Sequence, residues 1–71
     1  MPTHYDVLGV RSDAPPEDVR RAYLNRAREL HPDRTATKAP NEAARAARRM
    51  QEVNEAWRIL RDPNTRAAYD Q

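Results

Sequence analysis

The stretch His31-Pro32-Asp33 decides where the first long helix of this chain ends. Pro32 has no backbone N–H and disfavours the α conformation for the residue before it, so that helix must end at about Leu30. His31 and Asp33 are then held in a loop beside a rigid kink. Loops on rigid scaffolds are where binding residues tend to lie. A His-Pro-Asp tripeptide is common by chance, so its meaning depends on the segments around it.

Two long helices flank the tripeptide. Residues 16–30 and 41–60 carry apolar side chains three and four residues apart, which is the spacing of a helix with one buried face. Asn41 is predicted to be the N-cap of the second helix. Residues 31–40 lack such periodicity and are predicted to form a loop. Two long helices joined by one loop pack as an antiparallel hairpin.

A short helix is predicted on each side of this hairpin. Thr3 and Asp6 have the spacing of a capping box, which predicts a first helix over residues 4–8, and Gly9 is suited to a left-handed C-cap. An aspartate followed by a proline opens a last helix over residues 63–69. The two short helices cover the open sides of the hairpin, so the predicted fold class is all-α.

The chain is predicted to form one small domain over residues 1–71. Apolar residues make up 38% of it and Phe is absent, so we expect a free energy of unfolding of only about 3–5 kcal/mol. The predicted core consists of Tyr5, Leu8, Met50, Val53, Trp57, Leu60 and Tyr69. The sequence does not decide whether the Tyr23 side chain points toward the core or away from it.

Composition excludes several classes of protein. The chain has no cysteine, which excludes disulfides and thiolate metal sites, and no apolar run of membrane-spanning length. His4 is too isolated to be a metal ligand and is predicted to be solvated. No charged-then-apolar leader is found at the N-terminus. We therefore expect a cytoplasmic monomer that contacts no membrane and uses no cofactor or metal.

The cations are unevenly distributed along the chain. Residues 20–49 hold nine Lys and Arg against three Asp and Glu, a local net charge of +6, whereas the whole chain has +2. An acidic partner surface is the natural inference, with nucleic acid as the alternative. Arg20 and Arg21 lie in the same strip as the loop and are candidate contacts. The later cations Arg45, Arg48 and Arg49 are interpreted as a solvated helix face.

Five segments, in order, resemble the J-domain, the helper module of the DnaJ class of co-chaperones. They are HYDVLGV at 4–10, VRRAY at 19–23, HPD at 31–33, MQEVNEAWRIL at 50–60, and Asp62-Pro63 followed by RAAYD at 66–70. The resemblance runs from about Tyr5 to Asp70. No single segment is specific, but five in the family's order are a strong signal.

The resemblance implies a four-helix module that is not an enzyme and that stimulates ATP hydrolysis by a DnaK-type (heat-shock 70 class) chaperone. By analogy, Asp33 would reach an arginine where the chaperone's nucleotide domain meets its linker, and His31 and Pro32 would hold that carboxylate in place. Cations of the second helix would steer the module onto an acidic patch of the chaperone. The implied partner-binding residues are His31, Pro32, Asp33, Arg20, Arg21, Tyr23 and Arg34.

The chain departs from the family's pattern at several positions. Arg26 and Arg28 stand where apolar residues are usual, and Met50 stands where an aromatic residue is usual. Leu24 and Asn25 occupy positions where many J-domains have cations. Arg26 also interrupts the inner apolar stripe, so its aliphatic stem is predicted to lie on the core with its head in water. The loop after the tripeptide is longer than in compact members.

Other interpretations stay open. The tripeptide alone is compatible with a local turn. A catalytic His–Asp pair is disfavoured, because Thr35 is the one nearby nucleophile and the chain is too short for an enclosing pocket. Binding DNA in the helix-turn-helix manner is disfavoured by the long, proline-containing connection and by Glu52 and Glu55 on the second long helix. A J-like scaffold without ATPase stimulation is the remaining alternative.

Overall fold

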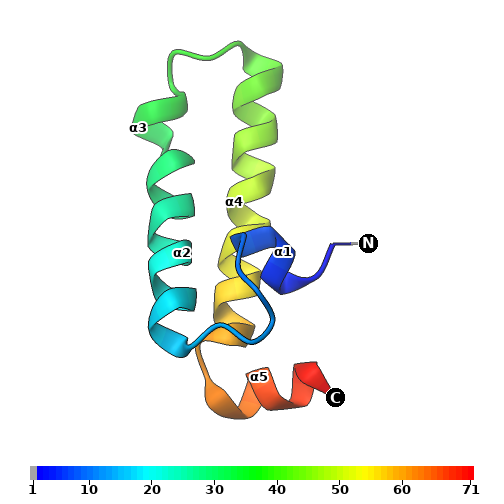
Figure 1. Cartoon of the computed structure of the whole chain (residues 1–71). Helices are drawn as coiled ribbons and strands as arrows, with labels where there is room; N and C mark the ends of the chain where they lie inside the picture. The colour runs from blue at the N-terminus through cyan, green and yellow to red at the C-terminus, as the bar shows by residue number, and fades with distance from the viewer. Residues whose placement is uncertain (1) are drawn as a thin grey trace.

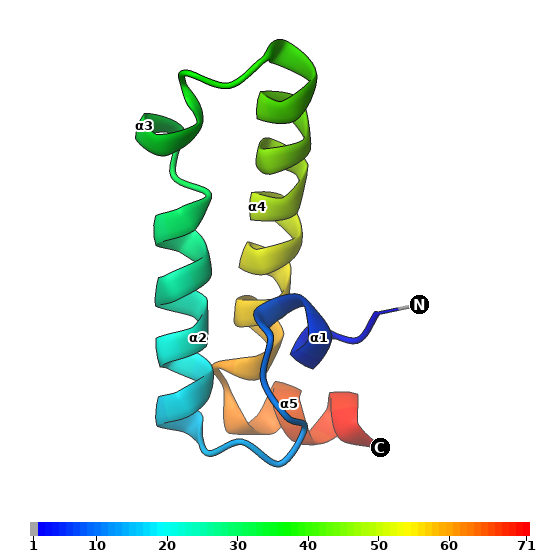
Figure 2. The same ribbon diagram turned by 45° about the horizontal axis from the view of Figure 1, so that its top comes forward.

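The computed structural model describes residues 2–71, in which every regular element is a helix. The helices are α1 (His4–Leu8), α2 (Pro16–Glu29), α3 (Pro32–Thr35), α4 (Pro40–Leu60) and α5 (Pro63–Asp70). The long helices α2 and α4 stand side by side in opposite directions, α1 lies against their lower half, and α5 crosses beneath (Figures 1 and 2). The predicted all-α fold with an antiparallel hairpin is confirmed.

The connection between the long helices contains a helix that was predicted as loop. Pro32 occupies the first position of α3, where its fixed φ suits a helix and its missing N–H costs nothing. The backbone N–H groups of Arg34 and Thr35 then donate to the His31 carbonyl, at 2.9 and 3.2 Å. The proline that ends one helix therefore begins the next.

The start of α4 also differs from the prediction. The helix begins at Pro40, and its N-cap is Ala39, which has no side chain able to cap it. Asn41 lies inside the first turn instead of capping it. The reason is again that proline is well suited to the first helical position. The predicted caps of α1 are confirmed, since the Thr3 capping box is formed and Gly9 has φ 76°.

The core lies where α1, α2 and the second half of α4 meet. Its buried members are Tyr5, Leu8, Val19, Val53, Ala56 and Leu60. Trp57 and Met50, predicted as core, are only half-buried, and Tyr69 is 37% exposed. Trp57 packs against the edge of the core, where its ring stacks on Tyr23 with ring centres 4.8 Å apart and an interplanar angle of 8°.

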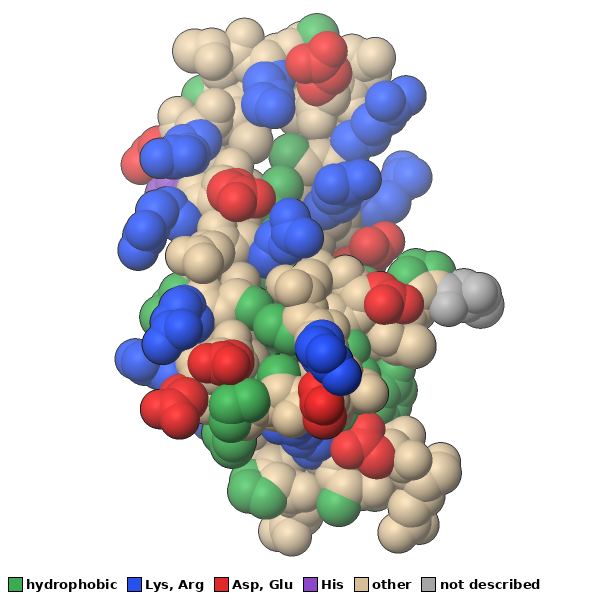
Figure 3. Space-filling view, in the orientation of Figure 1, with side chains coloured by type: hydrophobic (Ala, Val, Ile, Leu, Met, Phe, Trp, Pro, Cys, Tyr) green, Lys and Arg blue, Asp and Glu red, His purple; other side chains and the backbone are tan. Residues whose placement is uncertain are grey.

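Charge is as uneven in space as it is along the sequence. Figure 3 shows Lys and Arg gathered over the upper half of the visible face, over α3, the loop after it and the first half of α4. Acidic and apolar side chains are more frequent toward the lower half. The molecule is therefore electropositive at the end that carries the loop between the long helices.

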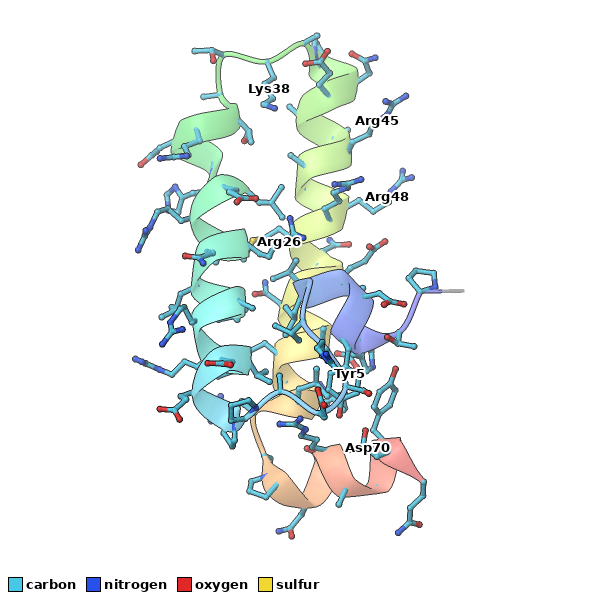
Figure 4. All side chains as sticks on the ribbon, in the orientation of Figure 1. Tyr5, Arg26, Lys38, Arg45, Arg48 and Asp70 are labelled. Carbon is cyan, nitrogen blue, oxygen red and sulfur yellow. The ribbon has the colours of Figure 1, made fainter. Side chains whose placement is uncertain are left out.

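Helix α5 is held by polar contacts, since none of its residues is buried. Arg66 donates to the Tyr5 hydroxyl at 3.1 Å and to the Ala14 carbonyl at 2.6 Å. The Tyr5 hydroxyl in turn donates to the Asp70 carboxylate at 2.6 Å, and Figure 4 shows these two residues approaching each other from α1 and α5. A second tie joins His4 to α5: its backbone N–H donates to the Tyr69 hydroxyl, and the two rings lie against each other with their centres 4.5 Å apart and their planes tilted by 33°. The prediction that His4 is solvated is therefore wrong.

Because of this network, the stability of the fold is expected to decrease at alkaline pH. Burial raises the pKa of the Tyr5 phenol, the bond to Asp70 raises it further, and Arg66 opposes both. A group with a raised pKa in the folded state contributes fully below its unfolded pKa of about 10 and loses that contribution as pH rises through the folded pKa. We expect the free energy of unfolding to fall between pH about 9 and about 11.

Urea unfolding at the two pH values measures this effect. The matched variant Tyr5→Phe keeps the ring but has no proton to lose, so its stability should change less over the same range. An equal fall in both proteins would show that other groups cause it.

Candidate functional site

The chain changes direction at His31. Helix α2 ends at Glu29, and the N–H of the next residue, Leu30, donates to the Arg26 carbonyl at 3.0 Å. His31 then adopts φ −59° and ψ 139°, outside the α region, as expected for a residue before proline. The predicted helix end at Leu30 is one residue beyond the last helical residue.

His31 caps α3 with its side chain. Its Nδ1 accepts a hydrogen bond from the Asp33 backbone N–H at 3.2 Å, as the side chain of an N-cap residue does. The Asp33 carboxylate lies beside it, with Oδ2 3.6 Å from the same Nδ1. The imidazole therefore fixes the backbone of Asp33, from which the carboxylate projects.

The Asp33 carboxylate points into solvent. Its side chain is 92% exposed, and within residues 2–71 its oxygens accept no hydrogen bond. A carboxylate that projects from a held backbone, with free lone pairs, is a ready acceptor for a guanidinium or ammonium group of another molecule. Arg34, next to it on α3, is also exposed.

Thr35 anchors α3 to the rest of the molecule. It is 8% exposed, the one buried polar side chain of residues 2–71, and its hydroxyl lies 3.4 Å from the Pro32 carbonyl and 3.5 Å from the His31 carbonyl. Its neighbours on both sides are exposed, so Thr35 is the point at which this helix is tied down. The hydroxyl is occupied with backbone and buried, which removes it as a nucleophile. Nothing in the sequence distinguished Thr35 as structural.

The outer face of α2 forms a stripe that leads toward the loop. Arg20, Leu24 and Arg28 follow each other at intervals of four residues, all exposed, over about 12 Å of helix. Arg21 lies beside the stripe and forms an ion pair with Asp18 at 3.6 Å. Arg20 and Arg21 were predicted from the sequence as contacts, whereas Arg28, which continues the row, was not. The spacing of four was the available signal.

Tyr23 does not join this stripe. Its ring stacks on Trp57, and its hydroxyl donates to the Asn54 side-chain oxygen at 3.2 Å. Its first role is therefore to join α2 to α4. Of the seven residues predicted to bind a partner, His31, Pro32, Asp33 and Arg34 lie together, whereas Arg20 and Arg21 lie two to three turns back along α2.

The capping role of His31 leads to a prediction about stability. An Asn side chain caps as well as any residue, whereas Ala has no cap, so His31→Ala should lower the free energy of unfolding by about 1 kcal/mol and His31→Asn by less than about 0.5 kcal/mol. Urea unfolding of the two variants measures the difference. Equal losses would show that the imidazole does not act as a cap.

The family model described as the DnaJ domain matches residues 3–70. The chain belongs to the DnaJ domain family. The J-domain fold is also found in the solution structure of the J-domain of a mouse DnaJ-like protein, with a TM-score of 0.85 and 26% sequence identity. That match covers 97% of this chain and 74% of the mouse chain.

Curated relatives of this J-domain carry the name chaperone protein DnaJ. The protein from Cyanothece sp. is 46% identical over 67 residues, and that from Dinoroseobacter shibae is 45% identical over 67 residues, in each case 94% of this chain. The protein from Carboxydothermus hydrogenoformans is 44% identical over 68 residues, or 96% of this chain. The J-domain described here spans 16% of the length of each of these relatives.

Membership of this family decides between an enzyme and a binding module. J-domains are not enzymes, so the predicted absence of catalysis holds, and His31 and Asp33 are not a catalytic pair. Within residues 2–71, no group of three or more His, Cys, Asp or Glu is arranged to hold a metal ion. Nor is any helix of this range long and apolar enough to cross a membrane.

Proposed function

We propose that this J-domain binds a DnaK-type chaperone, of the heat-shock 70 class, and stimulates its ATP hydrolysis through the His31-Pro32-Asp33 loop, in support of protein folding. The J-domain carries out no chemistry. It binds more tightly to the chaperone conformation that is poised for hydrolysis and so raises the population of that conformation.

The observation that carries this proposal is the exposed carboxylate of Asp33, which projects from a turn whose backbone is held by the His31 cap. Its partner would be an arginine where the chaperone's nucleotide domain meets its linker, joined by a charge-assisted hydrogen bond. Because the His31 cap and the buried Thr35 already hold the turn in place, little conformational freedom is lost when the contact forms. Pro32 keeps the turn rigid, and Arg34 lies at its edge.

The stripe on α2 would make the second part of the contact. Arg20, Arg21 and Arg28 present positive charge to an acidic patch of the chaperone, and Leu24, 42% exposed, adds an apolar contact among them. A contact of this kind raises the rate of encounter more than it raises affinity. The apolar position also makes the contact less dependent on salt than a row of cations would.

The steering role of Arg20 is tested by its association rate. Arg20 forms no ion pair within residues 2–71, so Arg20→Ala should slow association with the chaperone by about threefold to tenfold at low ionic strength, with a smaller effect at high ionic strength. Stopped-flow fluorescence measures the rate. Arg61→Ala removes a cation just after the last residue of α4, outside the α2 stripe, and serves as the control. An effect of Arg20→Ala that is the same at every ionic strength would contradict steering.

The domain extent, oligomeric state and location of the module are also part of what we propose. We propose that residues 1–71 act as one unit, as a monomer, in the cytoplasm; Met1 lies outside the described residues. Two other functions, DNA binding and an inactive scaffold, fit less well. Neither makes use of an exposed carboxylate at the end of the hairpin, and a carboxylate there would repel a phosphate backbone.

Complex formation with the chaperone tests the partner directly. A purified DnaK-type chaperone is titrated into the fluorescently labelled J-domain, with ATP and then with ADP, and anisotropy is recorded. Tighter binding with ATP supports the proposal, because the proposed contact selects one nucleotide state. Equal anisotropy with and without the chaperone, repeated with a second chaperone of the class, would contradict it.

A further inference from the structure

A pocket of about 230 Å³ opens between α1, α2 and α4, and none of its lining residues belongs to the α2 stripe or to the tripeptide. Its apolar wall consists of Pro2, Val7, Leu30 and Val53. This volume and this wall suit one aliphatic side chain.

Arg26 stands at this pocket from an unusual position. It lies on the inner stripe of α2, half-buried, where the helical spacing calls for an apolar residue. Its guanidinium crosses over the C-cap of α1, and its Nη2 would lie 2.7 Å from a Cβ added at Gly9. An ion pair with Glu29, at 3.6 Å, holds it from the other side. Gly9 therefore has two roles: its left-handed backbone caps α1, and its lack of a side chain leaves room for the Arg26 guanidinium.

Positive charge continues from the pocket toward the loop between the long helices. We call the cations there the basic arc: Arg26, Lys38, Arg45, Arg48 and Arg49. Figure 4 shows Arg26 extending from α2 toward α4, Lys38 directed into the space below the loop, and Arg45 and Arg48 on the outer side of α4. Arg49 lines the pocket itself.

Most cations of the arc form no ion pair among the described residues; Arg26, which pairs with Glu29, is the exception. Arg11 pairs with Asp13 and Arg58 with Glu55, at 3.1 and 2.7 Å. Within residues 2–71, the arc's Lys38, Arg45, Arg48 and Arg49 form no ion pair, and Figure 3 shows blue side chains prevailing over this part of the surface. Arg45 and Arg49 lie four residues apart on α4, so they are neighbours on one face of the helix and together present positive charge that is complementary to acidic side chains.

We propose that the pocket and the basic arc together bind an acidic peptide segment of a partner protein. One aliphatic side chain of the segment enters the pocket between α1, α2 and α4. Its aspartates and glutamates then run toward the loop and contact Arg45, Arg49 and Lys38. This site goes beyond the proposed chaperone contact, does not rest on it, and gives the module a second surface with its own partner.

The charges of the pocket favour a peptide over nucleic acid. Asp6, Glu29 and Glu52 also line the pocket, so a continuous phosphate backbone that crossed it would meet like charge. A peptide avoids this by placing its uncharged residue there and its acidic residues beyond. None of the lining residues is aromatic, so the pocket has no ring on which a base would stack.

A defined probe tests the site. The probe is a fluorescein-labelled peptide with one leucine followed by a run of aspartates and glutamates, titrated onto the J-domain at low ionic strength. Two control peptides replace the leucine with serine or the acidic residues with their amides. We expect both controls to bind at least about tenfold more weakly. Equal binding of the serine peptide would contradict use of the pocket, and tighter binding of an oligonucleotide of equal charge would overturn the choice of partner.

Matched variants locate the site. Arg45→Gln with Arg49→Gln removes two cations of the arc, and Arg11→Gln with Arg61→Gln removes two cations outside it. We expect the first pair to weaken binding of the probe by about tenfold and the second pair by less than about twofold. Equal losses would mean that only the overall charge matters and would overturn the proposal.

The same proteins separate this site from the chaperone contact. Asp33→Asn should bind the probe as the original chain does, and the Arg45, Arg49 double variant should still stimulate a DnaK-type chaperone. Loss of stimulation in that double variant would assign the arc to the chaperone contact and would overturn a separate site. Circular dichroism of each variant excludes loss of the fold as the cause.

Discussion

Replacing Asp33 with Asn is expected to abolish stimulation of the chaperone's ATP hydrolysis while leaving the helices intact. The change removes the negative charge and keeps the size of the side chain. The backbone N–H of residue 33, which His31 caps, is unaffected. Because the carboxylate accepts no hydrogen bond within residues 2–71, the fold loses nothing. Removing one partner of a buried, hydrogen-bonded charge pair weakens binding by about 2–5 kcal/mol. A loss of this size is enough to remove nearly all stimulation.

The matched control is Asp13→Asn. Asp13 is also exposed, in the segment between α1 and α2, and its change alters the net charge by the same amount. It should stimulate the chaperone as the original chain does. Circular dichroism and urea unfolding of both variants complete the comparison. A loss of helicity in Asp33→Asn would make that carboxylate structural and would contradict its proposed role.

Leu8→Ala is expected to leave much of the population unfolded. Leu8 is 2% exposed and belongs to the core cluster formed by α1, α2 and α4. Truncating a buried leucine costs about 2–5 kcal/mol, from lost burial and from the cavity that remains. A domain of this size has only about 3–5 kcal/mol in total, so the loss is comparable with its whole stability.

Leu24→Ala makes the same chemical change at the surface. Leu24 is 42% exposed on the outer face of α2, and its loss should change the free energy of unfolding by less than about 0.5 kcal/mol. Thermal unfolding followed by circular dichroism compares the two variants. Similar transitions for both would contradict the position of the core at the junction of α1, α2 and α4.

The fold was predictable from the sequence where local signals agreed with packing. The capping box at Thr3, the left-handed Gly9 and the apolar spacing of the long helices all pointed to the same structure. The start of α4 was not predictable in this way, because Pro40 and Asn41 are both good residues for a helix start, at different positions. Helix α3 was missed because four residues are too few to show any periodicity.

The candidate site was predictable in its residues but only partly in its geometry. The tripeptide was found because Pro32 must interrupt a helix. The hydrogen bond from the Asp33 N–H to His31 and the burial of Thr35 both depend on the turn of α3, which no spacing of apolar residues in the sequence indicates. The direction of Tyr23 was also not predictable. A half-buried aromatic residue at the edge of a helix points toward a neighbouring helix only if that helix has a side chain on which the ring can pack. In this chain α4 carries Trp57 at that place, and the two rings stack.

The measurement that tests the central claim most directly is the rate of ATP hydrolysis by a purified DnaK-type chaperone, titrated with this J-domain and, in parallel, with Asp33→Asn. The rate should rise to a plateau with the original chain and stay at its basal value with the variant. A folded original chain that leaves the rate at its basal value with more than one such chaperone, or a variant that stimulates equally, would contradict the claim that the loop carries the function.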